Sequence, residues 1–415
     1  MRKSSVIIAA LLIGGIALQG AGLPKSSPKS QGMSRERLQR VSETAQRFVD
    51  EKKHSGVITL IARNGKVVQS SAHGYRDIEA RKPMEMDTIC RIYSMSKLIT
   101  SVAVLKLVED GKVLLDDPVE KFWPELAARK VINGGSATAP DLQPAGRSVT
   151  VRHLLTHTAG YVYDFSAGGA AQEIYRSSKL WETKTMPECI AEVAKLPLVH
   201  LPGEKYAYGI NTDILGAIVE KASGQVFEDY LHDAIFKPLK MNDTSFDVPE
   251  NKRDRLAKTY QRNSEGKLVE AEPIIGTHPT PGMQSGGGGL FSTIEDYSRF
   301  AQMLVNGGEL DGARILSPKT IELMTQNHLT RLDPPHLPGN PSRGFGLGPE
   351  VVIELAHAST LGSAGQYGWY GAATTYCQID PKEKLIAIAF AQHFPFNQDN
   401  FFTYFANSYY QAITK

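Results

Sequence analysis

Two pairs of β-branched-rich segments, one pair near each end of the chain, restrict the fold more than any other feature of the sequence. The first pair surrounds Asn64-Gly65, the dipeptide most typical of a tight hairpin turn. The second pair flanks the turn-forming residues 380–383. We expect these strands to share one antiparallel sheet, although they come from opposite ends of the chain. The expected strands are residues 57–62, 66–71, 374–379 and 385–390.

The segment between the two hairpins is mostly helical in pattern. This arrangement predicts an α+β fold, with a sheet formed by about residues 32–112 and 345–415 and an inserted, mainly helical region at about 113–344. We expect a functional site where the helical region meets the sheet. The expected helices are residues 94–109, 151–157, 186–195, 212–222, 226–235, 294–305, 318–326 and about 401–413.

The N-terminal residues predict export. An apolar run at residues 6–18 follows a basic start and precedes small residues, which gives residues 1–23 the layout of a secretory signal peptide. We expect cleavage near residues 20–24, a flexible linker at 24–31, and a periplasmic or secreted protein without a stable membrane span. No cysteine follows the leader, so a lipoprotein anchor has no support. An uncleaved N-terminal anchor is the alternative.

The net charge and the cysteine content argue against several classes of protein. Residues 24–415, which would remain after cleavage, suffice for one large catalytic unit or two packed subdomains. A net charge of +2 argues against a nucleic-acid-binding protein. The three cysteines, Cys90, Cys189 and Cys377, are too few for a disulfide framework, and we interpret them as small buried apolar groups. The oligomeric state leaves no signal in the sequence.

A serine and a lysine three residues apart are the strongest catalytic signal. Residues i and i+3 share a helix face, so Lys97 can take the proton of the Ser94 hydroxyl. S-x-x-K occurs three times, at residues 26–29, 94–97 and 264–267. The first match lies in a Pro/Ser-rich stretch and the third in a turn-like stretch, so only Ser94 opens a predicted helix. Serine is also a common helix cap, which is the structural alternative.

Other patterns point to structural roles. His153 and His157 have the i, i+4 spacing of metal ligands, but no neighbouring carboxylate completes a site, so we expect structural histidines and no metal. The glycines at 286–289 lack the residues of a phosphate-binding loop and predict a turn where two segments approach closely. The chain has no G-x-S-x-G motif, which leaves the Ser-Lys pair as the simplest catalytic hypothesis.

Five segments, taken in order from residue 91 to residue 372, resemble the serine β-lactamase and penicillin-binding-protein superfamily. The nearest branch looks like the class C β-lactamase-related hydrolases called family VIII carboxylesterases. The resemblance extends from about residue 32 to the C-terminus and implies a β-lactamase/DD-peptidase-like fold. The five segments are residues 91–97, 153–160, 206–225, 288–293 and 368–372.

The resemblance assigns catalytic roles to three side chains. It implies that Ser94 is the acylated nucleophile, that a neutral Lys97 amine is its base or base partner, and that Tyr208 is the proton relay. Tyr206, two residues earlier, is a competing assignment for the relay. The backbone N–H groups of Ser94 and Ala372 would form the oxyanion hole.

The same resemblance places substrate-binding residues on a strand near the C-terminus. Trp369, Tyr370 and Gly371 occupy the position of the K-T-G motif, and Gly371 would leave the strand edge open for substrate. Trp369 could instead be a packing residue. Class C β-lactamases have Lys at the Trp369 position and a Y-x-N motif, whereas here Ile210 follows Gly209. Both departures count against efficient β-lactam hydrolysis.

The sequence therefore predicts an exported serine hydrolase that cleaves small carboxylic esters through an acyl-enzyme, without metal or organic cofactor. Two alternatives stay open. One is an amidase, either a β-lactamase or a D-amino-acid peptidase acting on cell-wall-type substrates. The other is a non-catalytic ligand-binding relative, which the presence of Ser94, Lys97 and Tyr208 disfavours.

Overall fold

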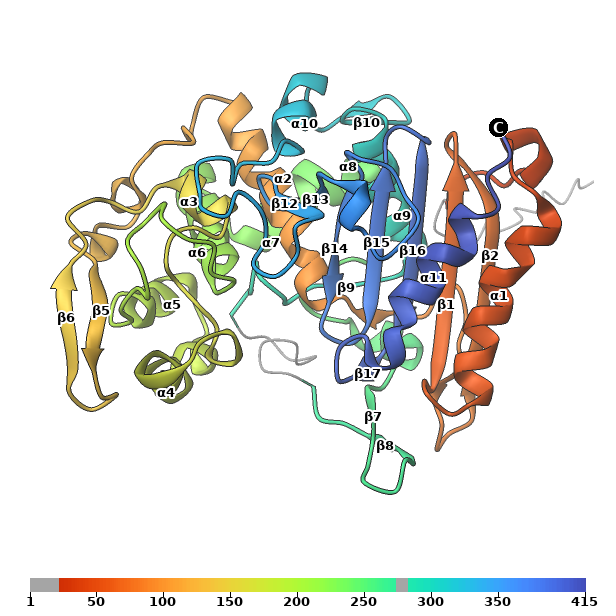
Figure 1. Ribbon diagram of the computed structural model, residues 1–415, viewed down its shortest axis with the longest axis horizontal. Coiled ribbons are helices and arrows are strands. Elements are labelled where there is room, and N and C mark those ends of the chain that lie inside the picture. The colour runs from red at the N-terminus through yellow and green to blue at the C-terminus, as the bar shows by residue number, and fades with distance from the viewer. Residues whose placement is uncertain (1–21, 274–282) are drawn as a thin grey trace, which may run out of the picture.

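The structure, a computed structural model, describes residues 22–273 and 283–415. It is built around an eight-stranded sheet in which every neighbouring pair is antiparallel (Figure 1). In spatial order the strands are β12 (Arg343–Phe345), β13 (Glu350–Val352), β14 (Tyr367–Gly371), β15 (Thr375–Asp380), β16 (Leu385–Ala391), β1 (Gly56–Arg63), β2 (Lys66–Asp77) and β3 (Lys82–Pro83).

The centre of the sheet joins the two ends of the chain. Strand β1 pairs with β16 from Val57 opposite Ala391 to Arg63 opposite Leu385, which confirms the predicted shared sheet. All eight residues of β1 and all seven of β16 are buried, because both faces of the sheet are covered. Alternate residues of each strand therefore point to different hydrophobic clusters.

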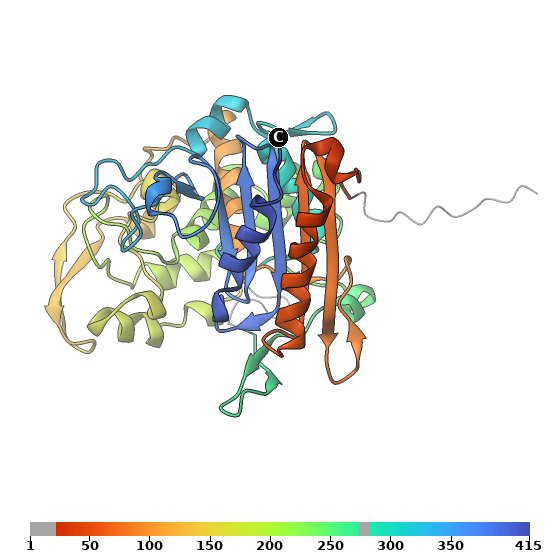
Figure 2. The ribbon, with the colours of Figure 1, turned by 45° about the vertical axis from the view of Figure 1, so that its right-hand side comes forward.

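Helices cover both faces of this sheet. Helices α1 (Arg35–Asp50) and α11 (Phe401–Tyr410) lie side by side on one face, as Figure 2 shows. Helix α9 (Ile294–Val305) packs on the other face, against β1, β15 and β16. Predicted residues 294–305 match α9 at both ends. Helix α1 was absent from the prediction, although Leu38, Val41, Ala45 and Phe48 have helical spacing and are buried.

The predicted helical region lies beside the sheet and contains most of the remaining elements (Figure 1). Its helices are α3 (Val151–Leu155), α4 (Gly169–Ser177), α5 (Met186–Val193), α6 (Asn211–Ser223), α7 (Phe227–Leu231), which continues as a π-helix (His232–Phe236), α8 (Lys237–Leu239) and α10 (Pro318–Met324). Small strand pairs complete the fold: β4 (Cys90–Arg91) with β9 (Phe291–Ser292), β5 (Lys130–Gly135) with β6 (Pro140–Pro144), β10 (Glu309–Leu310) with β11 (Ala313–Arg314), and β7 (Tyr260–Arg262) with β8 (Leu268–Glu270) and β17 (His393–Phe394).

Helix α2 begins later than predicted. The sequence predicts a helix at 94–109, whereas α2 spans Ser96–Glu109 and a 3₁₀ turn, Tyr93–Met95, precedes it. At the start of this turn, Tyr93 has a φ of 44° in the left-handed region, so regular helix cannot extend back through it. Helix α2 is surrounded by the rest of the protein along most of its length, because every residue from Ser96 to Leu105 is buried.

Residues 24–31, predicted as a flexible linker, are attached to the sheet instead. The N–H of Val67 in β2 donates to the carbonyl of Pro24, and the N–H of Ser26 donates to the carbonyl of Val67. Leu23 is buried in the main core. The preceding residues 1–21, which hold most of the predicted signal peptide, lie outside the described residues. No helix in the described part of the chain has the length and apolarity needed to cross a membrane.

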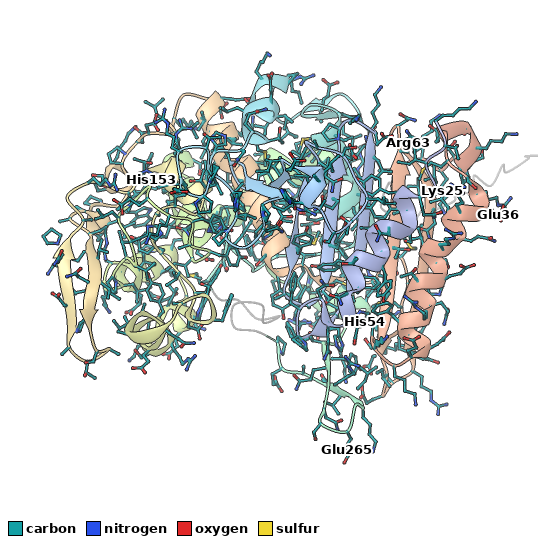
Figure 3. The ribbon with its side chains drawn as sticks, viewed as in Figure 1. Lys25, Glu36, His54, Arg63, His153 and Glu265 are labelled. Atoms are coloured by element: carbon teal, nitrogen blue, oxygen red, sulfur yellow. The ribbon has the colours of Figure 1, made fainter. Side chains whose placement is uncertain are left out.

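The three cysteines are buried and unpaired, in agreement with the prediction. Burial raises the pKa of the Cys90 thiol to about 12, so this thiol stays protonated and unreactive at neutral pH. The third S-x-x-K match, residues 264–267, is at the exposed tip of the β7–β8 hairpin, where Figure 3 labels Glu265. It therefore lies outside any helix, as expected.

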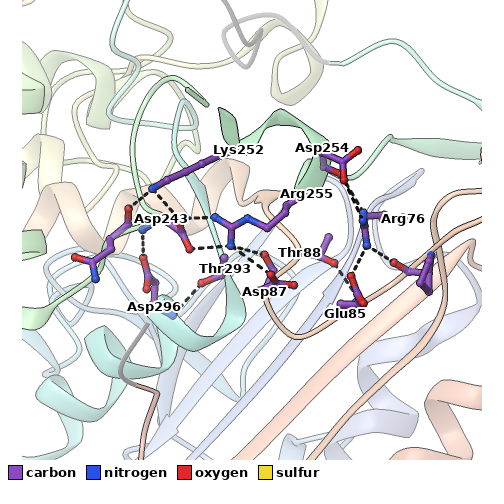
Figure 4. A network of polar contacts seen from close by, with 12 residues as sticks. Arg76, Glu85, Asp87, Thr88, Asp243, Lys252, Asp254, Arg255, Thr293 and Asp296 are labelled. Atoms are coloured by element: carbon purple, nitrogen blue, oxygen red, sulfur yellow. Dashed lines mark hydrogen bonds and ion pairs between the residues drawn. The ribbon is translucent and has the colours of Figure 1, made fainter. Parts of the chain in front are cut away.

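A network of ion pairs lies next to β4, the strand that leads to Ser94 (Figure 4). Arg255 forms ion pairs with Asp243 at 2.6 Å and with Asp87 at 3.6 Å. The N–H of Asp243 in turn donates to the Asp296 carboxylate of α9. These contacts connect residues 243–255 to the loop before β4 and to α9, and so hold the N-terminal side of the nucleophile turn.

A buried histidine makes the stability of the fold dependent on pH. His54, near one end of the sheet (Figure 3), is 1% exposed and packs on Phe48 and His393. Burial, with smaller effects of His393, Arg262 and Lys53, holds the pKa of its imidazole well below the usual value of 6.5. The unfolded chain therefore binds a proton below pH 6.5 that the folded chain does not, so stability falls as the pH decreases.

We expect the titration of His54 alone to decrease the wild-type free energy of unfolding by up to about 2 kcal/mol between pH 7.5 and pH 5.0. His54→Phe should make this decrease smaller by about that amount, since the aromatic packing remains and the titration is removed. Urea unfolding of both proteins at the two pH values measures the difference. An equally steep pH dependence in the variant would contradict the assignment.

Candidate active site

The nucleophile candidate lies in the turn between β4 and α2. Tyr93, with its left-handed backbone, precedes Ser94 directly, and the N–H of Met95 donates to the carbonyl of Ile92 at 3.0 Å. Ser94 is partly exposed, whereas Lys97, one helical turn later, is 1% exposed. The turn thus directs the hydroxyl outward and the amine into the protein.

Three residues predicted from the sequence meet at this point. Lys97 Nζ donates to Ser94 Oγ at 3.2 Å, and the hydroxyl of Tyr208 donates to the same oxygen at 2.7 Å. The ammonium also lies 4.8 Å from the centre of the Tyr208 ring. Tyr208 belongs to the segment just before α6, so the helical region supplies one proton-carrying group and the α2 helix supplies the other. This geometry allows proton exchange among all three groups.

Two further partners of Lys97 were not predicted. Its Nζ donates to the hydroxyl of Tyr163 at 3.0 Å and to the carbonyl of Gly287 at 2.6 Å. With Ser94, these partners use all three N–H donors of an ammonium. Gly287 belongs to the predicted close-approach turn, and a Cβ there would lie 2.6 Å from an oxygen of Asp213. The prediction of a close approach is confirmed, but its role at Lys97 was missed.

Asp213 places a buried carboxyl behind Lys97. The hydroxyl of Ser285 and the N–H of Gly287 donate to one of its oxygens, at 2.5 and 3.1 Å. The hydroxyl of Tyr163 lies 3.5 Å from the other oxygen, so Tyr163 stands between Asp213 and Lys97. Burial raises the pKa of the Asp213 carboxyl, and the positive charge of Lys97 opposes this rise. Each of the two opposite charges therefore stabilises the charged form of the other inside the protein.

The structure distinguishes the two tyrosines that competed for the relay. Tyr208 contacts Ser94, whereas Tyr206 packs on the rings of His157 and Phe345. Asn211, the displaced asparagine, also points elsewhere, because its side-chain amide contacts His157 Nδ1 at 2.8 Å. Ser94 therefore has Tyr208, and neither Tyr206 nor Asn211, beside it.

The predicted substrate-binding residues of β14 lie on different faces of the sheet. The Trp369 ring lies 5.6 Å from the ring of Tyr208 and is 8% exposed, so it forms part of the wall of the site. Tyr370, expected to contact substrate, points to the opposite face, where it stacks on Phe402 and donates to Glu350 at 2.9 Å. The reason is the alternation of side chains along a strand.

The end of β14 also lies directly against the nucleophile turn. A Cβ on Gly371 would lie 2.3 Å from the carbonyl oxygen of Ile92, so only glycine allows this contact. Ala372, whose N–H was predicted to serve the oxyanion hole with that of Ser94, follows at this strand end. The approach supports that prediction, and the oxyanion role itself stays a prediction.

The two histidines of the metal-like spacing have separate structural partners. His153 Nδ1 accepts a hydrogen bond from the Thr150 N–H at the start of α3. Burial and the charge of Lys97 hold the pKa of His157 well below 6.5. In the described part of the chain, no group of three or more His, Cys, Asp or Glu side chains is arranged to hold a metal ion.

Comparisons with known proteins agree with this geometry. The Beta-lactamase family model matches residues 41–407. The chain belongs to the β-lactamase family. It is 36% identical to protein Rv1367c of Mycobacterium tuberculosis over 82% of this chain and 86% of that protein. It is 29% identical to a lovastatin esterase of Penicillium rubens, over 80% of this chain and 85% of that one.

A solved structure of this β-lactamase-like fold covers nearly the same residues. EstCE1, described as a hydrolase with promiscuous acyltransferase activity, superimposes with a TM-score of 0.75 at 25% identity, over 90% of this chain and 99% of that one. The chain is thus a serine hydrolase of the β-lactamase and penicillin-binding-protein superfamily, with esterases and acyltransferases among its relatives. The predicted family, fold class and enzyme class are confirmed.

Two tyrosine variants test the relay in this β-lactamase-family site. We expect Tyr208→Phe to lower kcat on an ester by about 10²-fold or more, because it removes the proton donor beside Ser94. Tyr206→Phe, the matched control two residues away, should stay within about twofold of wild type. Steady-state kinetics of the two purified variants measure both effects. Equal losses would assign the tyrosines a shared packing role.

Proposed function

We propose that this protein is an exported carboxylesterase that acts through an acyl-enzyme at Ser94. The observation that carries the proposal is the position of Ser94 Oγ, which lies 3.2 Å from Lys97 Nζ and 2.7 Å from the Tyr208 hydroxyl. A serine with a proton acceptor and a proton donor within hydrogen-bond distance has the parts that nucleophilic acyl transfer needs.

The proposed reaction has two halves. In the first, Ser94 Oγ attacks the ester carbonyl while its proton passes to Lys97 if that amine is neutral, or to a Tyr208 phenolate if Lys97 is an ammonium. The tetrahedral oxyanion would accept hydrogen bonds from the N–H groups of Ser94 and Ala372. Tyr208 then gives a proton to the leaving alkoxide. In the second half, water attacks the acyl-Ser94 ester and gives a proton to the Lys97–Tyr208 pair, which returns one to the departing Ser94 oxygen as the carboxylic acid leaves.

Several features favour esters over β-lactams and peptides. Trp369 replaces the lysine that binds the carboxylate of a β-lactam in class C enzymes. Asn211 is engaged with His157 and so does not offer its amide beside Ser94. The esterase among the relatives and the hydrolase among the structural neighbours support the same substrate class. β-Lactam or D-amino-acid amide hydrolysis is the alternative activity.

Acyl transfer to an alcohol is a second candidate reaction. EstCE1 is described as having promiscuous acyltransferase activity. Chemically, transfer needs only that an alcohol replace water in the second half of the reaction. The same Tyr208 that protonates a leaving alkoxide would then deprotonate the incoming alcohol.

Export is proposed from the leader pattern of residues 1–23. Because Leu23 is buried and Pro24 pairs with β2, signal peptidase should cut before Leu23, within the predicted interval that begins at residue 20. Expression in a bacterium with its native leader, followed by intact-mass analysis of the periplasmic fraction, should give a mature chain that starts at residues 21–23. A full-length chain, or one that starts after Leu23, would contradict this proposal.

The activity is tested with two substrates and one mass measurement. Purified protein is mixed with p-nitrophenyl acetate and, separately, with a chromogenic cephalosporin, and intact mass is recorded after a rapid acid quench. We expect ester turnover, a mass gain of one acetyl group, and peptide mapping of that group to Ser94. Preferred turnover of the cephalosporin would support the amidase alternative, and acylation by neither compound would contradict a catalytic role for Ser94 on these substrates.

A further inference from the structure

A cavity of about 810 Å³ is lined by Tyr208 and by other residues of the helical region. Its volume lies in the upper part of the range that holds drug-sized ligands. Four parts of the fold form its walls: the β5 strand, the segment from Val162 to the start of α4, the segment at residues 199–208, and the loop between α10 and β12. Apolar side chains dominate these walls, among them Ile132, Val162, Ala170, Val199, Leu337 and Pro338.

The position of Tyr208 indicates which part of an ester would enter this cavity. Its hydroxyl contacts Ser94, and Tyr208 and the preceding Ala207 are both lining residues of the cavity. In the proposed reaction Tyr208 delivers the proton to the leaving oxygen, so the leaving oxygen must lie next to it. The alcohol carbon skeleton attached to that oxygen therefore lies on the Tyr208 side of Ser94, where the cavity opens.

Among the described residues, the lining of the cavity carries a positive charge and no negative charge. Lys205 is an exposed lining residue, and no described Asp or Glu lines the cavity. The nearby Glu204 is engaged with Arg147 at 3.0 Å, and Lys205 forms no ion pair with any residue that the structure describes. The lining histidine, His200, is kept neutral at pH 7 because burial lowers the pKa of its imidazole. An anionic group in the cavity would thus meet one uncompensated cation.

We propose that this cavity is the alcohol subsite, and that it selects esters of bulky apolar alcohols that carry a carboxylate near Lys205. The inference rests on the proposed esterase function and adds the class of leaving group. An alcohol acceptor in a transfer reaction would occupy the same subsite, since release and attack pass through the same geometry.

Three acetate esters test the proposal at constant acyl group: 6-acetoxy-2-naphthoate, its neutral methyl ester, and 2-naphthyl acetate. Wild type should prefer the carboxylate by kcat/KM. Lys205→Met should lower kcat/KM for the carboxylate by about threefold, and Lys205→Glu by about tenfold, with less than twofold change for both neutral esters. The matched control is Lys382→Met, which removes an exposed lysine at the β15–β16 turn and should change nothing. Addition of 1 M NaCl should abolish the Lys205 effects.

A cavity-filling variant tests which half of the ester occupies the cavity. Ala170→Leu, at a partly exposed position of α4, should lower kcat/KM for all three naphthyl esters by about tenfold. The ratio between p-nitrophenyl acetate and p-nitrophenyl octanoate should stay unchanged, because these substrates differ only in the acyl chain. Deacylation of acetyl-Ser94 should be equal in all variants, since the alcohol has left by then.

The outcomes separate this inference from the function on which it rests. If no ester acetylates Ser94 in wild type, the esterase proposal fails. If acetylation occurs but Lys205→Met and Lys205→Glu leave the preference for the carboxylate intact, the anionic alcohol class is wrong. If Ala170→Leu changes the acyl-chain ratio and spares the naphthyl series, the cavity is an acyl subsite, which overturns the assignment.

Discussion

Replacing Ser94 by alanine is expected to lower kcat for ester hydrolysis by at least about 10⁵-fold, the scale seen when a nucleophile is removed. The reason is geometric. Among the residues that the structure describes, only Ser94 Oγ forms hydrogen bonds with both Lys97 Nζ and the Tyr208 hydroxyl, so we expect no other hydroxyl to take over the attack. The fold should be unaffected, because Ser94 is partly exposed and lies in a turn outside α2.

The matched control is Ser264→Ala, which removes the serine of the exposed S-x-x-K match at the β7–β8 tip. This variant should keep wild-type kcat and wild-type acylation by p-nitrophenyl acetate. Burst kinetics and intact mass after substrate addition measure both variants. Retained acylation in Ser94→Ala would show that another group is the nucleophile.

Replacing Lys97 by methionine should reduce both activity and stability. We expect kcat to fall by about 10³ to 10⁴-fold, because the variant loses the amine that exchanges protons with Ser94 and Tyr208. The free energy of unfolding should fall by about 3 kcal/mol, since Asp213 then stays buried without its compensating charge. Lys267→Met, in the exposed match, is the control and should change neither quantity by a measurable amount.

A double variant separates the two effects of Lys97. In Lys97→Met/Asp213→Asn the uncompensated carboxylate is gone, so about half of the lost stability should return while activity stays low. Urea unfolding and ester kinetics of the single and double variants measure this cycle. If the Asp213→Asn change only adds a further loss of stability, the electrostatic pairing of Lys97 with Asp213 is contradicted.

The local signals of the sequence predicted the framework well. The Asn64-Gly65 turn and the residues 294–305 gave hairpin and helix bounds that agree with β1, β2 and α9 within a few residues. The backbone conformation of Tyr93 could not be predicted from such local signals. Its left-handed backbone, unusual for a non-glycine residue, has no signature in the sequence and depends on the packing around the turn.

The contacts of the site depend on distant parts of the chain. Ser94 and Lys97 were predicted from their spacing on a helix, and the family resemblance added Tyr208. Tyr163 was missed, because nothing near it in the sequence indicates that its hydroxyl meets Lys97. Asp213 carried a usable signal, since it is an acidic residue next to the apolar stretch of α6 and is fully buried. A buried acid needs a partner, and Lys97 is the cation it meets.

The pairing of β1 with β16 sets the time at which this enzyme can become active. Strand β1 is synthesised early, but its antiparallel neighbour β16 and the site strand β14 come from the last part of the chain. Contacts between such distant segments form late in folding. A ribosome-bound chain thus carries Ser94 and Lys97 long before it has the Trp369 wall and the Gly371 strand end. The chain therefore cannot become catalytically active until its synthesis is nearly complete.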